Sequence, residues 1–336
     1  MKWEGKDAMI SVVIPVFNEQ PSLAILHQEL VEVAQSQGYE MEIIFVDDGS
    51  KDGSWEEIKK LAASDPRVRG IRFRRNFGKA AALSAGFEAA AGEVIMTLDA
   101  DLQDDPHEIP RFLAELEKPL DVVNGWKRIR HDPWHKVIPS RIFNWMVGWL
   151  TGVKLHDHNC GMKCYRREVL SEIRLYGELH RFVPVLAAAR GFRVGEIEIH
   201  HRPRRFGKSK YGVSRFAKGF VDLLTVKFLT GYGQRPQHLL GTLGVLCLGL
   251  GALALVWLAG LWVFSRVLPD WEPIHLHQRP AVIYAVGLVL LGGQLLSVGF
   301  LGELIVAQQP REIRPFSVSE TIGGQLREPH APSLPG

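Results

Sequence analysis

Four carboxylates fall within the seven residues 99–105 of the stretch TLDADLQDD, which occupies positions 97–105. They follow directly on the apolar run VIMTL. Acidic side chains crowded this closely repel one another, and a turn needs only one Asp or Asn for its local hydrogen bond. The spacing therefore predicts a site that receives something cationic.

The acidic residues of this stretch divide by position. Asp101 and Gln103 stand two apart, so their side chains can point the same way in an extended segment. Carboxylate and carbonyl oxygens suit a hard divalent cation, which can bridge a protein to phosphate groups. Asp104 and Asp105 fit a simple acidic turn better, because Pro106 is typical of the first position of a helix. We therefore expect no ligand at Asp104 or Asp105.

The elements that must position these residues alternate between short apolar runs and helical stretches. Strands are expected over 10–16, 42–46, 68–73, 94–98 and 121–123, and helices over 21–37, 54–63, 79–91 and 106–117. Such alternation predicts an α/β fold with a mostly parallel sheet flanked by helices. Ligands bind beyond the carboxyl ends of the strands in such sheets. Polar clusters occur at those ends, as PVFNE at 15–19, DDGS at 47–50 and DAD at 99–101.

Composition excludes several classes of protein. The 336 residues allow one or two domains with a sizeable core, and 40 Lys and Arg against 37 Asp and Glu give a net charge of only +3. This balance does not favour a nucleic-acid partner. Three cysteines form no disulfide framework, and the polar start MKWEGKDAM lacks the apolar core of a secretion signal. We expect a cytoplasmic N-terminus.

Two long apolar segments predict membrane helices. Residues 239–264 carry no charge and would extend roughly 39 Å as a helix, more than the ~30 Å hydrocarbon layer of a bilayer. Residues 281–307 form a second candidate, with Gln294 midway and Glu303 near its end. The alternative for each is a buried core helix, which their length and apolarity disfavour.

Basic residues flank the two spans on one side. Lys218, Lys227 and Arg235 precede the first span, and Arg311 and Arg314 follow the second, whereas the loop 265–280 balances two Arg with two acids. The positive-inside rule then places both termini in the cytoplasm and the loop in the periplasm.

Residues 213–230 predict an amphipathic helix beside the first span. Its apolar stripe consists of Val213, Phe216, Phe220, Leu223, Leu224 and Phe228. A cationic helix of this kind is typical of the lipid headgroup region, and the alternative is packing against the α/β domain. The segment after Gln309 is rich in Pro, Gly and Ser, so we expect it to be weakly ordered.

Six motifs occur in order along the chain. They are IPVFNE (14–19), VDDGSKDGS (46–54), RNFGKAAALSAGF (75–87), LDADLQDDP (98–106), CGMKCYRRE (160–168) and HRPRRFGKSKYG (201–212). With the two membrane spans, they resemble the polyprenyl-phosphate glycosyltransferases of family 2 of the inverting glycosyltransferases. The resemblance covers nearly the whole chain. It implies a GT-A fold, a nucleotide-sugar donor, a polyprenyl-phosphate acceptor and Mg²⁺ or Mn²⁺.

The resemblance also implies roles for the residues on the donor side. Asp101 and Gln103 become direct metal ligands, with Asp99 close to the metal or the nucleotide. The nucleotide contacts that it implies are Pro15, Glu19, Asp48, Lys79 and Asp99. Asp48 also follows the second strand, where acidic residues of other doubly wound folds bind a ribose. The alternatives are an early-helix acid for Glu19 and a solvated lysine for Lys79.

Cations gather in two segments that suit a lipid phosphate. The first segment holds Arg128, Arg130, Lys136 and Arg141, and the second holds Arg202, Arg204, Arg205, Lys208 and Lys210. Arginine offers two-pronged contacts to phosphate, while attraction to anionic headgroups is a competing role, and we expect both. The acceptor phosphate is assigned to Arg128, Lys136, Ser140 and Arg141, and a covering loop to Arg202, Arg205, Ser209 and Lys210.

A phosphomonoester loses its second proton with a pKa of about 6, so positioning should matter more than proton removal. The resemblance gives Asp157 a base or orienting role, and Arg128 and Asp101 complete the catalytic candidates. A turn before Cys160 is the alternative for Asp157. His156 and His158 flank it, but two histidines in a loop do not make a zinc site.

The expected function is the inverting transfer of one sugar to a polyprenyl phosphate such as undecaprenyl phosphate, at the inner membrane. A processive polysaccharide synthase is one alternative, but its Q-x-x-R-W motif is missing, and residues 178–182 read ELHRF. A non-catalytic membrane-anchored binding protein is another. Glycines at 292, 293, 299 and 302 could support a homo-oligomer. The expected domains are a cytoplasmic catalytic domain (1–212), an interfacial helix (213–237), two membrane helices (238–308) and a cytoplasmic tail (309–336).

Overall fold

The structure is a computed structural model. It describes residues 8–128, 134–173, 175, 179–203, 205–206, 214–232, 236–268, 275–276, 279–308 and 318–322. At 134–136, 214–218, 229, 232, 236, 306–308 and 318–321 it describes the backbone alone. The chain forms two units, one of residues 1–226 with 312–336 and the other of residues 227–311.

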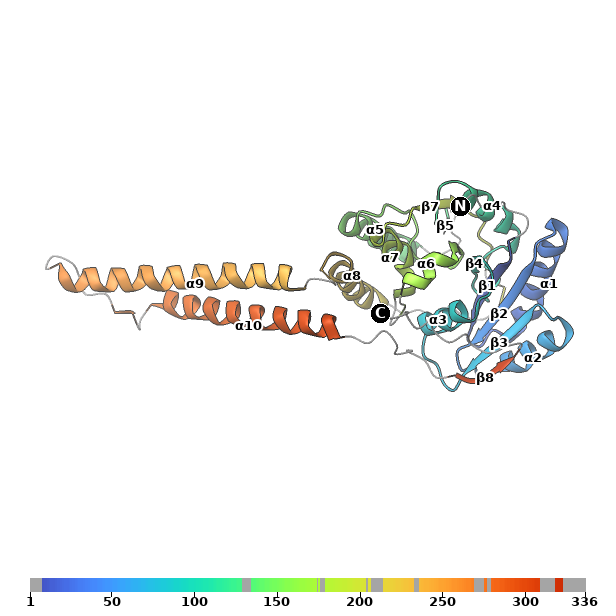
Figure 1. Cartoon of the computed structure of the whole chain (residues 1–336), viewed down its shortest axis with the longest axis horizontal. Helices are drawn as coiled ribbons and strands as arrows, with labels where there is room; N and C mark the ends of the chain where they lie inside the picture. The colour runs from blue at the N-terminus through green and yellow to red at the C-terminus, as the bar shows by residue number, and fades with distance from the viewer. Residues whose placement is uncertain are drawn as a thin grey trace, which may run out of the picture. The chain divides into compact units, whose positions relative to one another are not determined.

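The first unit is built on one mixed sheet with the strand order β7-β5-β6-β4-β1-β2-β3-β8 (Figure 1). β1 pairs in parallel with β2 and β4, β2 pairs in parallel with β3, and β5 with β7. β6 inserts antiparallel between β4 and β5. The strands are β1 (Ile10–Val16), β2 (Met41–Asp47), β3 (Val68–Phe73), β4 (Val94–Thr97), β5 (Val122–Trp126), β6 (Lys163–Arg166), β7 (Val194–Glu198) and β8 (Val318–Ile322).

Helices cover both faces of this sheet because its central strands are apolar on both sides. On one face Val12 and Ile14 pack against α1 (Gln20–Gln37), α2 (Ser54–Ser64) and α4 (Ile109–Glu117). On the other face Val13 and Ile44 pack against α3 (Lys79–Ala89), α6 (Arg167–Glu172) and α7 (Val183–Ala189). The predicted α/β fold with flanking helices is therefore confirmed. Short 3₁₀ turns, η1 (Pro106–Glu108) and η2 (Leu179–Arg181), precede α4 and α7.

A separate cluster joins α5 (Trp134–Thr151) to α8 (Ser214–Tyr232). Leu223 and Val226 of α8 are buried against Val147 of α5 and residues of α7. Packing against the α/β domain, the alternative for this amphipathic helix, thus holds for one of its faces. Phe220, Val221 and Leu224 remain 45%, 61% and 48% exposed.

The expectation of a weakly ordered tail is wrong for residues 318–322. These residues form β8, which pairs antiparallel with β3 at the edge of the sheet (Figure 1, red beside cyan). Val318, Thr321 and Ile322 are residue types that favour strands, and the partner edge offers them unpaired backbone groups. The high Pro, Gly and Ser content of the whole segment after Gln309 gave no sign of this five-residue strand.

The second unit holds α9 (Pro236–Val267) and α10 (Pro280–Gln308), which lie side by side (Figure 1). Gln237–Val267 and Pro280–Ile305 are long and apolar enough to cross a membrane. A Cβ at Gly244 or Gly292 would lie 2.9 Å or less from the backbone of the other helix. Gly244 and Gly292 therefore allow α9 and α10 to approach closely.

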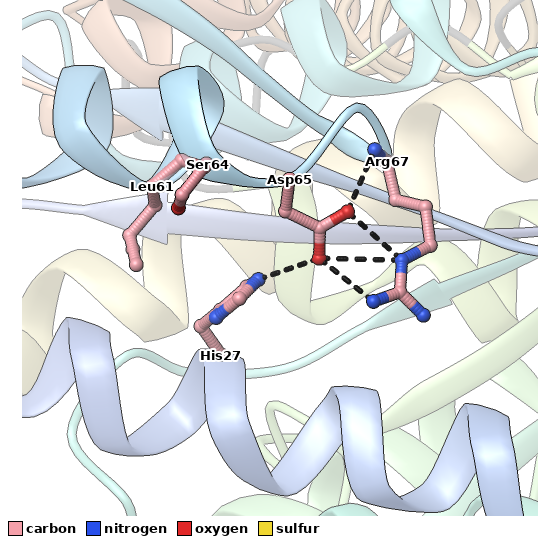
Figure 2. A network of polar contacts seen from close by, with 5 residues as sticks. All are labelled: His27, Leu61, Ser64, Asp65 and Arg67. Carbon is pink, nitrogen blue, oxygen red and sulfur yellow. Dashed lines mark hydrogen bonds and ion pairs between the residues drawn. The ribbon is translucent and has the colours of Figure 1, made fainter.

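Asp65 anchors a polar network on the outside of the sheet. Its carboxylate lies 2.9 Å from Nε2 of His27 in α1 and accepts bonds of 2.9 Å from both Nε and Nη2 of Arg67 (Figure 2). The bonds from Arg67 lower the pKa of Asp65 to about 2. Because Asp65 ends α2, this network fastens α1 and α2 to the start of β3.

We predict that Asp65→Asn lowers the free energy of unfolding by about 1–2 kcal/mol near pH 7, since an ionised acceptor is lost. The folded pKa lies below the ordinary value of 3.8, so this stability is present above about pH 4 and disappears as the pH falls toward 2. Thermal denaturation in detergent at several pH values measures it. Glu57→Gln, which breaks only a surface ion pair with Lys60, should change little. A difference from wild type that stays constant down to about pH 3 would contradict this account.

Candidate active site

The loops that follow β1 and β2 are tied together at the carboxyl edge of the sheet. Asn18 adopts a left-handed backbone with φ 53°, which turns the chain after β1. Its side-chain oxygen accepts a 2.8 Å bond from the backbone N–H of Lys51, and its own N–H donates to Ser50 Oγ at 2.9 Å. Pro15 and Glu19 flank this connection. The two loops therefore form one rigid rim.

Asp48 fixes a third loop, between β3 and α3. Its carboxylate accepts bonds from the backbone N–H groups of Phe77 at 2.6 Å and Gly78 at 3.0 Å. Gly49 has φ 70°, and a Cβ there would lie 2.5 Å from the carbonyl carbon of Arg75. Burial raises the pKa of Asp48 to about 6, although both N–H groups favour the ionised form. Asp48 thus positions the loop of Phe77 and Gly78, a role in addition to the ribose or base contact expected from sequence.

Asp99 lies among three lysines. Lys79, the first residue of α3, forms an ion pair with its Oδ1. Burial alone would raise the pKa of Asp99, but the charges of Lys79, Lys127 and Lys163 outweigh burial and hold it below its ordinary value. Gly161 leaves the space that this carboxylate needs, since a Cβ there would lie 2.5 Å from Asp99 Oδ2.

Asp101 and Gln103 form a tight turn after β4. The backbone N–H of Gln103 donates to Asp101 Oδ1 at 3.1 Å, and Leu102 between them has φ 60°. The Gln103 carbonyl accepts a 2.9 Å bond from the N–H of Arg202, and Nε2 of the Gln103 side chain lies 3.4 Å from Nε2 of His201. Hydrogen bonds therefore hold the turn of Asp101 and Gln103 against the segment after β7.

The two remaining acids of the motif have structural partners. Asp105 Oδ1 accepts the backbone N–H of His107 at 3.0 Å and so caps η1, with Pro106 at its first position. Asp104 is fully buried and lies 2.7 Å from Lys127 Nζ. Asp105 thus marks the helix start expected before Pro106, and Asp104 pairs with a buried lysine.

A cavity of about 1140 Å³ opens beside this edge, between the end of β5 and α5. Its wall combines cations, including Lys127, Arg128 and Arg141, with the indole rings of Trp126, Trp145 and Trp149. Arg128 is 64% exposed and lies 3.2 Å from Glu198. Of the predicted acceptor residues, Arg128 and Arg141 line this cavity, and Ser140 precedes Arg141 in α5.

The second cationic segment is placed differently. Arg202 lies 2.8 Å from Glu29 and 2.7 Å from Asp105, so its guanidinium ties the segment to α1 and η1. Arg205 is exposed. Ser209 and Lys210 lie outside the described residues, as does the side chain of Lys136.

Asp157 is buried at 1% exposure in the loop before β6. Its Oδ1 accepts the N–H of Asn159 at 3.1 Å, and its carbonyl accepts Asn124 Nδ2 at 2.8 Å. These bonds fit the turn alternative for Asp157.

The two histidines beside Asp157 have other surroundings. Burial lowers the pKa of His158 to about 4, and the ring of His156 stacks on Trp126 with ring centroids 4.1 Å apart. Within the described part of the chain, no three His, Cys, Asp or Glu side chains gather as a metal site.

Comparison with known proteins decides the family. Residues 11–174 match the family described as Glycosyl transferase family 2. Over 308 residues the chain is 38% identical to a dodecaprenyl-phosphate galacturonate synthase of Rhizobium johnstonii, covering 90% of this chain and 89% of that protein. The chain belongs to glycosyltransferase family 2.

Other relatives agree with this assignment of the transferase. An undecaprenyl-phosphate 4-deoxy-4-formamido-L-arabinose transferase of Aeromonas hydrophila is 35% identical over 300 residues, which cover 88% of each chain. Among solved structures, glucosyl-3-phosphoglycerate synthase from Mycobacterium tuberculosis with Mn²⁺ and UDP-glucose superposes with a TM-score of 0.52 at 16% identity, covering 66% of this chain and 79% of that one. Mannosyl-3-phosphoglycerate synthase from Rubrobacter xylanophilus gives 0.52 at 14% identity, with 66% and 74% coverage. These likenesses establish the GT-A fold.

Sequence reasoning overlooked two lysines of the transferase. Lys127 stands beside Arg128 after the end of β5, yet its side chain is 14% exposed against 64% for Arg128. The charge of Asp104 raises the pKa of Lys127 despite burial. Lys163, in β6, is 4% exposed and its Nζ donates to the His158 carbonyl at 3.3 Å. Burial lowers its pKa to about 8, and only the placement of β6 beside β4 reveals it.

We predict that Gly161→Ala reduces transfer at least tenfold, because the added methyl group displaces the Asp99 carboxylate. The thermal midpoint should fall by only a few degrees, since one side chain must move. Gly231→Ala, where a Cβ meets nothing within 4 Å, is the matched control and should keep full activity. Product formation in detergent measures both variants, and wild-type turnover by Gly161→Ala would contradict the assigned position of Asp99.

Proposed function

We propose that this transferase moves one sugar from a nucleoside diphosphate donor to the phosphate of a polyprenyl lipid, with inversion at the anomeric carbon. The observation that carries the proposal is the position of Lys127, which lines the cationic and aromatic cavity and also lies 2.7 Å from Asp104 of the acidic motif. An acidic edge suited to a donor and a cavity suited to a phospholipid therefore adjoin. The relatives above are named as polyprenyl-phosphate sugar synthases and transferases.

The donor side suits a divalent cation. Asp99 and Asp101 supply carboxylates and Gln103 an amide, an all-oxygen set that Mg²⁺ or Mn²⁺ prefers. Two carboxylates with substrate phosphates are a usual way to hold Mg²⁺, so the lack of a third acid is no obstacle. When bound, the ion would offset the charge of the departing diphosphate. The solved structure with Mn²⁺ and UDP-glucose has the same fold.

The nucleotide would lie along the rim made by the first three loops. Pro15 and Glu19 border the base and ribose there, and Asp48 holds the loop of Phe77 and Gly78 while facing the same edge. Lys79 already neutralises a carboxylate at the motif, which suits it for a phosphate oxygen of the donor.

The acceptor phosphate would be held at the cavity. It is mostly a dianion near pH 7, so an oxygen can attack the anomeric carbon directly while the bond from that carbon to the diphosphate oxygen breaks. Arg128 and Arg141 would orient this phosphate, with Lys136, Ser140, Arg205, Ser209 and Lys210 as further contacts. Arg202 would steady the covering segment from its place beside Asp105. We assign Asp157 to orienting the loop before β6 rather than to accepting a proton.

The lipid side suits a membrane surface. Ile138, Ile142, Trp145 and Trp149 follow one another at helical spacing along α5 and are 51%, 54%, 68% and 73% exposed. Tryptophan is typical of the bilayer interface. We place this ridge and the exposed face of α8 in the headgroup layer of the inner membrane, with α9 and α10 spanning it and both termini cytoplasmic. The catalytic domain then comprises residues 1–212 together with β8.

We predict that Asp101→Asn lowers transfer at least a hundredfold, because the amide gives up a charge at the cation site. The assay follows radiolabelled UDP-sugars and GDP-sugars into an organic phase with undecaprenyl phosphate, with and without EDTA. Glu56→Gln, which breaks an exposed ion pair with Lys59 in α2, alters a carboxylate outside the motif and should keep most activity. Full turnover by Asp101→Asn, or in EDTA, would contradict the proposal, and a product carrying many sugars would favour a processive synthase.

We predict that Arg141→Ala raises the KM for undecaprenyl phosphate about tenfold and leaves the KM for the donor within twofold, since one charge-assisted phosphate contact is lost. Initial rates at varied lipid concentration in mixed micelles measure it. Arg190→Ala removes an exposed arginine after α7, away from the cavity lining, and serves as the control. An unchanged lipid KM would remove Arg141 from the acceptor site.

A further inference from the structure

The edge of the sheet beside β3 carries a strand from the far end of the chain. β8 pairs with β3 through Gly70 with Ile322, Ile71 with Thr321, Arg72 with Glu320 and Phe73 with Val318. Ile322 also packs against the core cluster that contains Trp55 and Ile58 of α2. Without β8, β3 would end the sheet with a row of unpaired backbone groups.

The pairing changes register between Arg72 and Phe73. The extra residue, Ser319, belongs to β8, and such a residue bends the strand that carries it. Beyond this bend β8 still pairs with Phe73, the last residue of β3, directly before the loop of residues 74–78. β8 therefore holds β3 up to the point where the chain leaves the sheet for the donor edge.

The loop that follows carries much of the donor edge. Phe73 contacts Phe77 edge to face, with ring centroids 5.7 Å apart. The N–H groups of Phe77 and Gly78 donate to Asp48, and Lys79 pairs with Asp99. An unbroken series of contacts thus runs from β8 through Phe73 to the carboxylates at the ends of β2 and β4.

We propose that β8 is a positioning element of the donor site: the strand after the membrane helices holds β3 so that the loop of residues 74–79 stays docked on Asp48. Donor affinity then depends on a segment that follows the two apolar helices in the chain. Its effect on donor binding rests on the proposed function, whereas its effect on the loop does not.

The loop can be tested without any ligand. Hydrogen exchange of the full chain in detergent is compared with a chain truncated after Phe316 and with one truncated after Leu326, which keeps β8. Loss of β8 should speed exchange at Phe77 and Gly78 at least fivefold, while β1 and β2 keep their protection. Unchanged exchange at Phe77 and Gly78 would overturn the proposal.

A second variant keeps the chain length. Glu320→Pro with Thr321→Pro removes two successive N–H groups, and successive residues of a strand point these groups to opposite sides, so one bond to β3 is lost whichever way the strand faces. It should reproduce the truncation. Protection lost throughout β1 and β2 in both variants would also overturn the proposal, because β8 would then hold the whole sheet.

Donor affinity is then measured by titrating UDP and GDP, each with Mn²⁺, into the same proteins. Without β8, the Kd of the better nucleotide should rise at least tenfold, while the KM for undecaprenyl phosphate stays within twofold. A Kd within twofold of wild type would reject the role of β8 in donor binding. If wild type itself bound neither nucleotide, the proposed function would fail, while the exchange result on the loop would stand.

Discussion

The charge balance around Asp99 is the constraint on which the rest of the structure depends. A carboxylate among further acids at the end of a buried strand is costly unless cations face it. Lys79 pairs with it directly, while Lys127 acts from the end of β5, one residue beyond the strand, and Lys163 acts from β6. The antiparallel insertion of β6 beside β4 brings Lys163 and Gly161 to this position. The part of the sheet where β6 runs antiparallel to its neighbours therefore supplies basic partners for the acidic motif.

The same balance links the two halves of the reaction. Lys127 is paired with Asp104 in the interior, yet it also lines the cavity of Trp126 and Arg141. A change of charge at the acidic edge therefore alters the electrostatic potential at the wall of the cavity, because little solvent screens the short distance between them. The family, the GT-A fold and the two apolar helices agree with an enzyme that joins a polar donor to a lipid.

Sequence pattern was sufficient where local chemistry decides the structure. The strands at 10–16 and 68–73 agree residue for residue, and Asp105 before Pro106 marks a real helix start. It failed where distant segments meet. β6 has four residues without a clear alternation, and β8 takes its order from the edge of β3 rather than from its own composition. Lys163 could not be found before β6 was placed. Arg202 appeared to belong with the other cations because a sequence does not show that Glu29 and Asp105 lie beside it.

The most direct test of the account is anomalous diffraction at the manganese edge from crystals of the transferase grown with Mn²⁺ and a nucleoside diphosphate. The account predicts one strong peak at about 2.0–2.3 Å from oxygens of Asp101 and Gln103, close to Asp99, with Lys79 turned to the phosphates. A peak elsewhere, or nucleotide bound with the ion pair of Lys79 and Asp99 intact and no metal at the motif, would contradict it.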